Sequence, residues 1–454
     1  MREKIVKQTC LFDGSLLNLI PFIKREKVLK KMDAVIENNP QLIGAVHEDI
    51  TKDKTHTGCR GLSSEQIFRT AILRQLKGYS WRELAERLND GICLRWFSRI
   101  YTGKIPHYTS LQKAIHQISH KTWETINEQI REFAREQKVE NGRYMRADTT
   151  VTETNILYPV DARLLWDGVR VLTRIMEKIK EQSPSTDFAF SNRTRGAKRW
   201  CYKIVMVKGP NAEKKRRKLY RKLIKIADDV FKMASSCMAI SNLSPDFAIQ
   251  AQLDQLDNFL TLTAVAISQC ERRVINGEKV PVDHKIVSMF ETHTDIICRG
   301  KTQSPTEFGH KVSFFAGKSG LITQYKVLEG NPSDSDLFPE LMEKHERQYG
   351  KLPFHVAMDR RYFSKANEEL AYEKGVRRVS VCKPGYRSKE RQELEKEPWF
   401  KKLQKFRAGI EGIISGLMRG LGLKRCIWKG LESFKRYVGI SVVTFNIRKV
   451  ALLL

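Results

Sequence analysis

The sequence has few of the features that mark exported or disulfide-bonded proteins. Its 454 residues include nine cysteines, and no two of them form a C-x-x-C pair. Such scattered cysteines argue against a zinc site and a disulfide framework, so we expect buried, reduced thiols. No stretch approaches the ~18 apolar residues of a membrane span, and the first residues show neither the apolar run nor the cleavage site of a signal peptide. These absences predict a cytoplasmic protein without a membrane partner.

Acidic residues are scarce relative to basic ones. The chain has 81 Lys and Arg against 52 Asp and Glu, a net charge of +29. A surplus spread along the whole chain suits a polyanionic partner, of which DNA and RNA are the usual examples. An RNA-coating protein, such as a ribosomal one, or a peripheral membrane protein would carry a similar charge. The sequence also lacks the G-x-x-x-x-G-K-[ST] loop, which argues against an ATP-driven motor.

The segment 61–140 has the pattern of a small helical domain. Ser63 or Ser64 can cap a first helix with apolar residues at helical spacing, and a glycine-containing turn leads to a second helix. Arg82 and Arg87 lie on the outward side of that second helix. Helix, short turn and helix form the outline of a helix-turn-helix motif, which also arises by chance in many helical proteins. Together with the charge, it predicts an all-α DNA-binding domain.

Between residues 162 and 274 apolar residues recur at alternating spacings of three and four. Two such stripes separated by a short polar loop predict an antiparallel helical hairpin over 205–278. A basic run on the polar side of its first arm comprises Lys214, Lys215, Arg216, Arg217 and Lys218. Such a run is either a solvated helix face or a stripe that contacts phosphates, and the pattern leaves both readings open.

From residue 280 onward short β-like runs alternate with helical ones. The segment HKVSFFAGKSGLITQYKVLEG predicts a strand hairpin, and the later strands are FHVAM, VRRVSVCKP and YVGISVVTFNI, the last spanning 437–447. Helices are predicted after NPSDSD, where Asp334 and Asp336 are interpreted as helix caps, at 364–375 and at 399–420. Strands alternating with helices are typical of an α/β layer architecture.

Three carboxylates occupy informative places in this scheme. Asp148 stands in the β-branched run YMRADTTVTET, and Asp359 follows the strand FHVAM at the edge where α/β sheets bind ligands. Glu411 lies in the helix predicted over 399–420. Two neighbouring strands and a helix packed on them can bring such groups to one pair of Mg²⁺ ions. The residues alone do not select these three, since caps and surface ion pairs are the commoner roles of Asp and Glu.

A family resemblance selects them. The segments RADTTVTETNILYPVDARLLWDGVRVLTR, AMDRRYFS and RAGIEGIISGLMRGLGLKR resemble the three acidic motifs of bacterial insertion-sequence transposases of the DDE class. The wording D-T-T-V followed by N-I-x-Y-P-x-D-x-x-L-L is similar to the ISNCY group of these enzymes. The segment GYSWRELAERLNDGICLRWF resembles their DNA-end-binding domain. The resemblance runs from about residue 60 to the end of the sequence.

The resemblance implies an α/β fold with an RNase H-like mixed sheet, a helical insertion and a preceding helix-turn-helix-like domain. It implies that Asp148 on the first strand, Asp359 on the fourth and Glu411 on a late helix are catalytic and bind two Mg²⁺ ions, for which Mn²⁺ can substitute. Arg407, one helical turn before Glu411, would orient the carboxylate or hold a phosphate. The expected tyrosine is replaced by Gln404, and Arg419 lies one position beyond the expected downstream base. The glycines of this helix, Gly409, Gly412, Gly416 and Gly420, would allow close approach to the sheet or to DNA.

The implied organisation has five segments: an N-terminal segment (1–60), a DNA-end-binding domain (61–140), a first catalytic segment (141–204), a helical insertion (205–278) and a second catalytic segment (279–454). The implied function is cleavage and transfer of DNA strands at the inverted-repeat ends of an insertion sequence. Expected partners are double-stranded DNA, as element ends and target, and a second copy of the chain in the DNA complex, in the bacterial nucleoid. A non-catalytic DNA-binding protein, either a regulator or a decayed transposase, and a structure-selective nuclease of the same fold are the alternatives.

Overall fold

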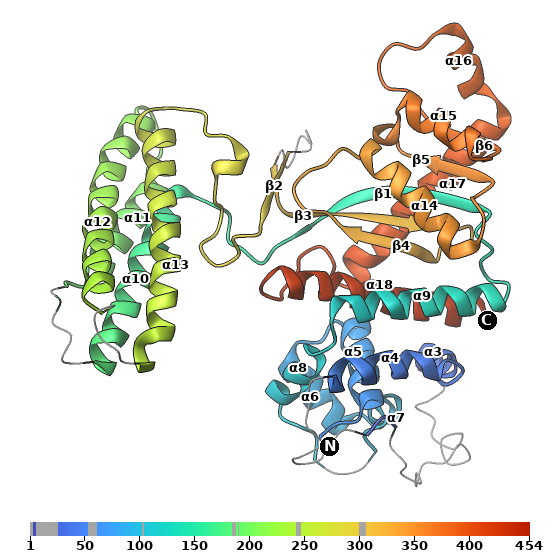
Figure 1. The fold of residues 1–454 in the computed structure, drawn as a ribbon, viewed down its shortest axis with the longest axis horizontal. Helices are drawn as coiled ribbons and strands as arrows, with labels where there is room; N and C mark the ends of the chain where they lie inside the picture. The colour runs from blue at the N-terminus through green and yellow to red at the C-terminus, as the bar shows by residue number, and fades with distance from the viewer. Residues whose placement is uncertain are drawn as a thin grey trace. The chain divides into compact units, whose positions relative to one another are not determined.

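The computed structural model describes residues 3–5, 26–52, 61–101, 104–183, 188, 190–241, 247–298 and 306–454. The chain forms two compact units (Figure 1). The core unit comprises Met1–Thr154 and Gly309–Leu454, and the helical unit comprises Asn155–Phe308. The helical unit is longer at both ends than the insertion predicted over 205–278, and the division into functional domains stays a prediction.

The described N-terminal region of the core unit is helical. Its helices are α3 (Lys27–Glu37), α4 (Pro40–Thr51), α5 (Ser64–Lys77), α6 (Trp81–Asp90), α7 (Ile92–Ser98), α8 (Tyr108–Ile115) and α9 (His120–Glu136). The predicted pair α5 and α6 is confirmed, and so is the cap of α5, which is Ser63. The Ser63 side chain accepts from the Gln66 amide in a reciprocal capping box, Gly78 ends α5 with a φ of +68°, and Ser80 caps α6.

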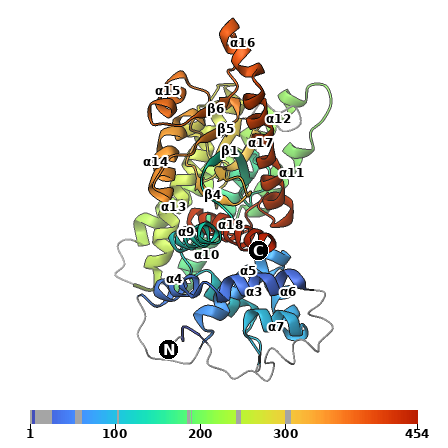
Figure 2. The ribbon, with the colours of Figure 1, turned by 90° about the vertical axis from the view of Figure 1, so that its right-hand side faces the viewer.

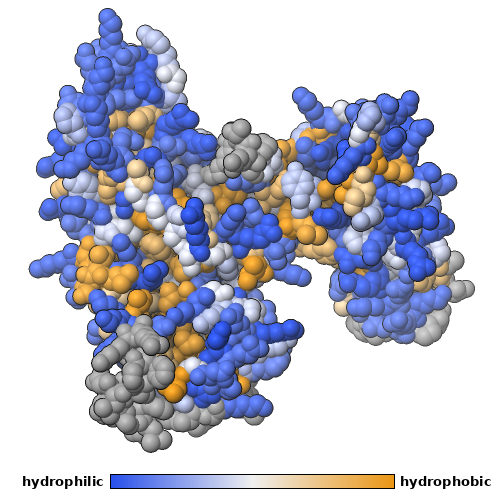
Figure 3. Space-filling view, turned by 180° about the vertical axis from the view of Figure 1, so that it is seen from behind, coloured by the Kyte–Doolittle hydropathy of each residue, from blue (hydrophilic) through white to orange (hydrophobic). Residues whose placement is uncertain are grey.

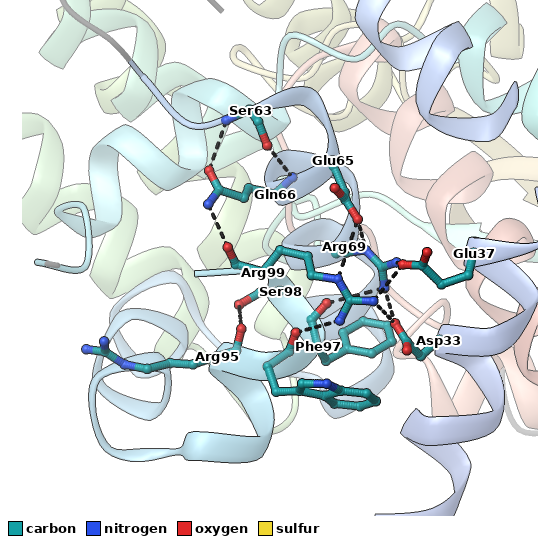
Figure 4. Close-up of polar contacts among 11 residues, drawn as sticks. Asp33, Glu37, Ser63, Glu65, Gln66, Arg69, Arg95, Phe97, Ser98 and Arg99 are labelled. Atoms are coloured by element: carbon teal, nitrogen blue, oxygen red, sulfur yellow. Dashed lines mark hydrogen bonds and ion pairs between the residues drawn. The ribbon is translucent and has the colours of Figure 1, made fainter. Parts of the chain in front are cut away.

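A buried ion cluster ties these helices together (Figure 4). Arg69 of α5 is fully buried, and its guanidinium lies 2.6 Å from Asp33, 2.6 Å from Glu37 and 2.8 Å from Glu65. Arg99, just after α7, meets the same Asp33 and Glu37 at 2.7 and 2.6 Å. A buried guanidinium is tolerated only when its charge is paired and its donors are bonded. This ion cluster therefore fixes α3, α5 and the end of α7 against one another.

The sheet is mixed and has the strand order β2-β3-β1-β5-β6, with β4 also paired to β3. The strands are β1 (Tyr144–Glu153), β2 (Asp295–Cys298), β3 (Thr306–Ala316), β4 (Ile322–Val327), β5 (His355–Met358) and β6 (Arg378–Val381). Strand β1 is antiparallel to β3 and parallel to β5, β5 is parallel to β6, and β3 and β4 form the predicted antiparallel hairpin. The mixed α/β class predicted from the sequence is confirmed.

Helices cover both faces of this sheet. They are α14 (Phe338–Tyr349), α15 (Lys365–Glu373), α17 (Pro398–Ser415), which continues as a π-helical turn at Gly416–Gly420, and α18 (Leu431–Leu453). The short helix α16 (Lys389–Lys396) has no buried residue and packs on α17. Met145, Ala147 and Met358 pack with residues of α14 in one apolar cluster. Phe314 packs with residues of α17 and α18 in another. Figure 2 shows α9 and α18 between the helices α3, α4 and α5 and the sheet.

The strand predicted over 437–447 is wrong, because this segment lies inside helix α18. The run is rich in β-branched residues, yet α18 is surrounded by α3, α5, α9 and strand β4, and nearly every residue of 437–447 is buried. A helix buried on all sides has no polar face, so its sequence lacks the amphipathic period that distinguishes a helix from a buried strand. At Gly439 an added Cβ would lie 2.6 Å from Trp123, so α9 and α18 approach closely there.

The helical unit contains the long helices predicted between residues 162 and 274. They are α10 (Asp161–Gln182), α11 (Thr194–Met206), α12 (Ala212–Ser241) and α13 (Phe247–Cys270), followed by a π-helical turn at Glu271–Ile275. Their inward residues, among them Leu172, Leu223 and Leu256, form one buried apolar cluster. Across the described residues of both units, we find no helix with the length and apolar character that a bilayer crossing demands.

Candidate active site

Asp148 and Asp359 stand side by side at neighbouring strands. The parallel register of β1 and β5 ends with Ala147 opposite Met358, and the two aspartates are the next residue of each chain segment. Ala147 and Met358 both pack in the cluster that contains α14. Because successive side chains of a strand alternate between faces, both aspartates belong to the opposite face of the sheet.

Helix α17 covers that opposite face. Arg146, which shares its face with Asp148, donates from Nη1 to the carbonyl oxygen of Phe406 at 2.8 Å and lies over the Phe406 ring at 4.6 Å. A Cβ added at Gly409 would collide with the Arg146 guanidinium. The close approach of the helix to the sheet, predicted from its glycines, is therefore confirmed at Gly409. The same helix carries Glu411, one turn after Arg407.

Arg407 links the second and third carboxylates. Its Nη1 lies 3.9 Å from Oδ1 of Asp359 and its Nη2 lies 3.4 Å from Oε1 of Glu411. The side chains of Asp359 and Glu411 are 33% and 66% exposed, so both carboxylates reach solvent. Asp148, Asp359 and Glu411, called the carboxylate group below, thus lie on one face of the sheet with one arginine among them.

A buried polar network supports the strand ends from the α14 side. Asp334, which is 4% exposed, accepts from the Thr149 hydroxyl at 3.1 Å and pairs with the Lys311 ammonium at 2.7 Å. Tyr362 lies beside it and bonds the Ser313 hydroxyl, and burial raises the pKa of Tyr362, helped by the charges of the nearby aspartates. The interpretation of Asp334 as a helix cap is corrected, because its carboxylate binds β1 and β3 instead. No pattern in the loop NPSDSD signals this long-range contact.

The donor chemistry of the carboxylate group suits a hard divalent cation, which prefers carboxylate oxygens. Asp148 and Asp359 are neighbours in the sheet register and fit as donors to one cation. Glu411 is engaged by Arg407 instead. Within the ranges that the structure describes, no three Asp, Glu, His or Cys side chains lie close enough to hold a metal ion. A three-carboxylate site therefore requires Glu411 to exchange its arginine contact for the cation.

The remaining predicted residues lie elsewhere. Arg419 is exposed on the π-helical turn after α17, and Arg82 and Arg87 are exposed on α6, with Arg82 over the Tyr108 ring at 5.2 Å. Lys214, Lys215, Arg216 and Arg217 belong to α12 of the helical unit, and their contact with DNA stays a prediction, as it does for Arg82, Arg87, Arg407 and Arg419.

Two regions of the chain match known families. Residues 17–117 match a transposase domain (DUF772), and residues 371–451 match a transposase DDE domain. No curated protein and no solved structure matches the chain. The two matches support a transposase, and more narrowly a DDE transposase of an insertion sequence, so the resemblance drawn from the three acidic motifs is confirmed at that level. The DDE match includes Arg407 and Glu411, whereas Asp148 and Asp359 lie outside it.

Proposed function

We propose that this protein is a DNA transposase that cleaves the inverted-repeat ends of an insertion sequence and joins them to target DNA, with Asp148, Asp359 and Glu411 as its catalytic carboxylates. One observation carries the proposal. Asp148 and Asp359 directly follow the last paired residues of the parallel strands β1 and β5, and Glu411 lies on helix α17, which covers the same face of the sheet. The chain that carries this arrangement also matches transposase domains.

The strand positions support an RNase H-like catalytic domain. Within the core unit β5 is the fourth strand along the chain, after β1, β3 and β4, and Asp359 follows it directly. The resemblance implies this same placement, with the first aspartate on strand one and the glutamate on a late helix. The ISNCY-like group and the helix-turn-helix-like reading of α5 and α6 belong to the same proposal and rest on the sequence motifs.

The residues divide the chemistry among them. Asp148 and Asp359 would hold the cation, while Arg146 and Gly409 hold α17 against the sheet and so position Glu411. Glu411 would complete the set of carboxylate donors, and the Arg407 guanidinium would bind a phosphate oxygen of the DNA strand, a partner that its planar donors suit. A bound pair of Mg²⁺ or Mn²⁺ ions would activate the attacking oxygen and stabilise the leaving one.

The function is tested with a plasmid that carries the two DNA ends flanking the coding sequence. With Mg²⁺, the wild-type chain is expected to nick both ends and to join pre-cleaved ends to a second plasmid. Cleavage without joining would indicate a structure-selective nuclease instead. Binding of the ends without any cleavage would indicate a non-catalytic DNA-binding protein. A homodimer bridging two ends is expected to appear as a paired-end complex in gel filtration.

A further inference from the structure

The helical unit concentrates positive charge on α11 and the first half of α12. Residues 193–225 contain 14 Lys and Arg and a single acid, Glu213. The following residues, 226–270, contain five acids and one Lys. Nearly half of the net charge of +29 therefore lies within 33 consecutive residues. This concentration separates α11 and the first half of α12 from the rest of the helical unit.

The two helices present their charges on a joint surface. Ala197 and Cys201 of α11 pack in the same apolar cluster as Leu223 of α12, which leaves the polar sides of both helices outward. We call this surface the basic face. Its exposed members are Arg195, Lys198, Arg199 and Lys203 on α11 and Lys214, Lys215, Lys218, Arg221, Lys222 and Lys225 on α12. Figure 3 shows some of the hydrophilic surface of this unit.

Trp200 joins the two halves of the basic face. Three cations surround its ring, with Arg199 at 5.2 Å and Lys203 at 5.1 Å from α11 and Lys222 at 4.8 Å from α12. A cation over an aromatic ring is stabilised without losing its charge. The indole therefore keeps positive side chains of both helices close together where no carboxylate neutralises them.

A merely solvated face would carry compensating acids. Exposed helix faces usually pair a base with an acid three or four residues away, and like charges at that spacing destabilise the helix. On α12 the lysines 214, 218 and 222 follow one another at that unfavourable spacing. Among the described residues of 193–225, the only ion pair joins Arg217 and Glu213, at 2.7 Å. A bound polyanion would relieve the repulsion between these lysines more fully than water does.

An open hollow lies where α11 turns into α12. It has a volume of about 780 Å³, and Lys214, Arg216 and Arg217 are among the residues that line it. The turn contains Gly209 and Asn211, both with positive φ. The hollow, which Glu213 also lines, adjoins the basic face at Lys214 and adds a concave stretch that a phosphate backbone can enter.

We propose that the basic face binds the phosphate backbone of double-stranded DNA without regard to sequence. The choice of DNA over another polyanion rests on the proposed transposase function; the presence of a polyanion site rests on the charge alone. Lysines 214, 218 and 222 repeat every four residues, about 6 Å along the helix, and duplex DNA carries one negative charge per ~1.7 Å of its axis. These three lysines can thus contact several phosphates of one duplex at once.

The test compares two triple variants of the full chain. The first changes Lys214, Lys218 and Lys222 to Gln. The matched control changes Lys178, Lys180 and Lys232 to Gln, which removes three exposed charges from the same unit outside the basic face. Affinity for a duplex of unrelated sequence is measured between 50 and 200 mM salt, roughly the range over which phosphate contacts weaken. Circular dichroism shows whether both variants fold like the wild type.

The basic-face variant is expected to bind at least ~10-fold more weakly at low salt, with a slope of log K against log salt that is shallower by about 2 to 3. The control variant is expected to keep the wild-type slope. Equal effects of the two variants, or a wild-type slope in the basic-face variant, would overturn the proposal, as would tighter wild-type binding to an RNA duplex or to anionic vesicles. Asp148→Asn lies outside the basic face and is expected to keep the wild-type salt slope, so loss of cleavage in that variant would bear only on the proposed function.

Discussion

The molecule contains two groupings of three acids around arginine, and they differ in how completely the acids are neutralised. In the ion cluster of the N-terminal helices, the buried Arg69 and the half-buried Arg99 meet three carboxylates, with closest contacts of 2.6 to 2.8 Å. In the carboxylate group of the sheet, the single Arg407 stands 3.4 and 3.9 Å from two of its acids. Arginines and carboxylates therefore have two different roles in this protein. The ion cluster holds helices together, whereas the long contacts of Arg407 leave Asp359 and Glu411 accessible to solvent.

The burial of the arginines explains this difference. An unpaired charge in the interior costs several kcal/mol, so Arg69, whose side chain is fully buried, requires a full set of acceptors. Arg407 and the carboxylates beside it reach solvent, retain part of their hydration and tolerate incomplete pairing. Substitutions in the ion cluster should thus change stability, whereas substitutions in the carboxylate group should change chemistry.

The largest expected effect is on DNA cleavage by Asp359→Asn, which keeps the shape of the side chain and removes its charge. We expect cleavage of an end-bearing plasmid to fall at least ~10³-fold, equivalent to about 4 kcal/mol in the barrier. The free energy of unfolding in urea should change by less than about 1 kcal/mol. Asp336→Asn, an exposed aspartate near the sheet, serves as the control and should keep full cleavage. Near wild-type cleavage by Asp359→Asn would remove Asp359 from the site.

Arg69→Met should have the opposite effect to Asp359→Asn, because it should lower the stability of the fold. It removes the fully buried guanidinium that pairs with three carboxylates, two of which, Asp33 and Glu65, are largely buried, so we expect a loss of about 3 to 5 kcal/mol of unfolding free energy. Urea unfolding followed by circular dichroism measures it. Arg87→Met, which loses only an exposed contact of 4.0 Å to Glu83, should cost less than about 1 kcal/mol. Equal costs for the two variants would show that the buried network is not what stabilises these helices.

His345 is a buried group that, unlike Arg69, is neutral in the folded protein. Its Nε2 donates to the Gly142 carbonyl oxygen at 3.0 Å, its Nδ1 has no partner among the described residues, and burial lowers its pKa to about 4. The unfolded chain takes up this proton near pH 6.5, so the contribution to stability is full above that pH and is lost as the pH falls toward 4. At pH 5 we expect a loss of about 2 kcal/mol relative to pH 7.

The measurement is urea unfolding at pH 7 and pH 5 for the wild type and for His345→Gln, which keeps a donor without titrating. Between pH 7 and pH 5, the unfolding free energy of His345→Gln should therefore fall by about 2 kcal/mol less than that of the wild type. An identical pH dependence in both proteins would mean that the native state accommodates a charged His345.

The smallest effect is expected for Arg407→Gln. Its ion pairs are long and lead to partly exposed acids, so the unfolding free energy should change by less than about 1 kcal/mol. Differential scanning calorimetry beside Arg69→Met makes the contrast direct. A destabilisation above 2 kcal/mol would place Arg407 with the ion cluster, as a structural arginine.

Local sequence patterns predicted the elements that carry the carboxylates. The β-branched run around Asp148, the apolar strand before Asp359 and the strand hairpin after residue 306 are short-range features, and the structure confirms each as strand. The long helices of the helical unit have a clear period and are confirmed as well. The positions of the three carboxylates, however, were selected by resemblance to DDE transposases.

Long-range contacts could not be predicted. The ion cluster joins Asp33 to Arg69 and Arg99 across 36 and 66 positions, and the Asp334 contact to Thr149 spans 185. No local spacing signals such pairs. Helix α18 was missed for a related reason, since a helix surrounded by other elements loses the polar face from which a helical period is read.

The central claim, that the carboxylate group holds catalytic metal ions, is tested most directly by replacing a carboxylate with a thiolate. Mn²⁺ accepts sulfur more readily than Mg²⁺, whose preference for oxygen is strict. We expect Asp148→Cys and Asp359→Cys to be inactive in cleavage with Mg²⁺ and to regain measurable cleavage with Mn²⁺, while the wild type cleaves with both. Wild-type rates with Mg²⁺ in either variant, or no recovery with Mn²⁺ in both, would contradict the account.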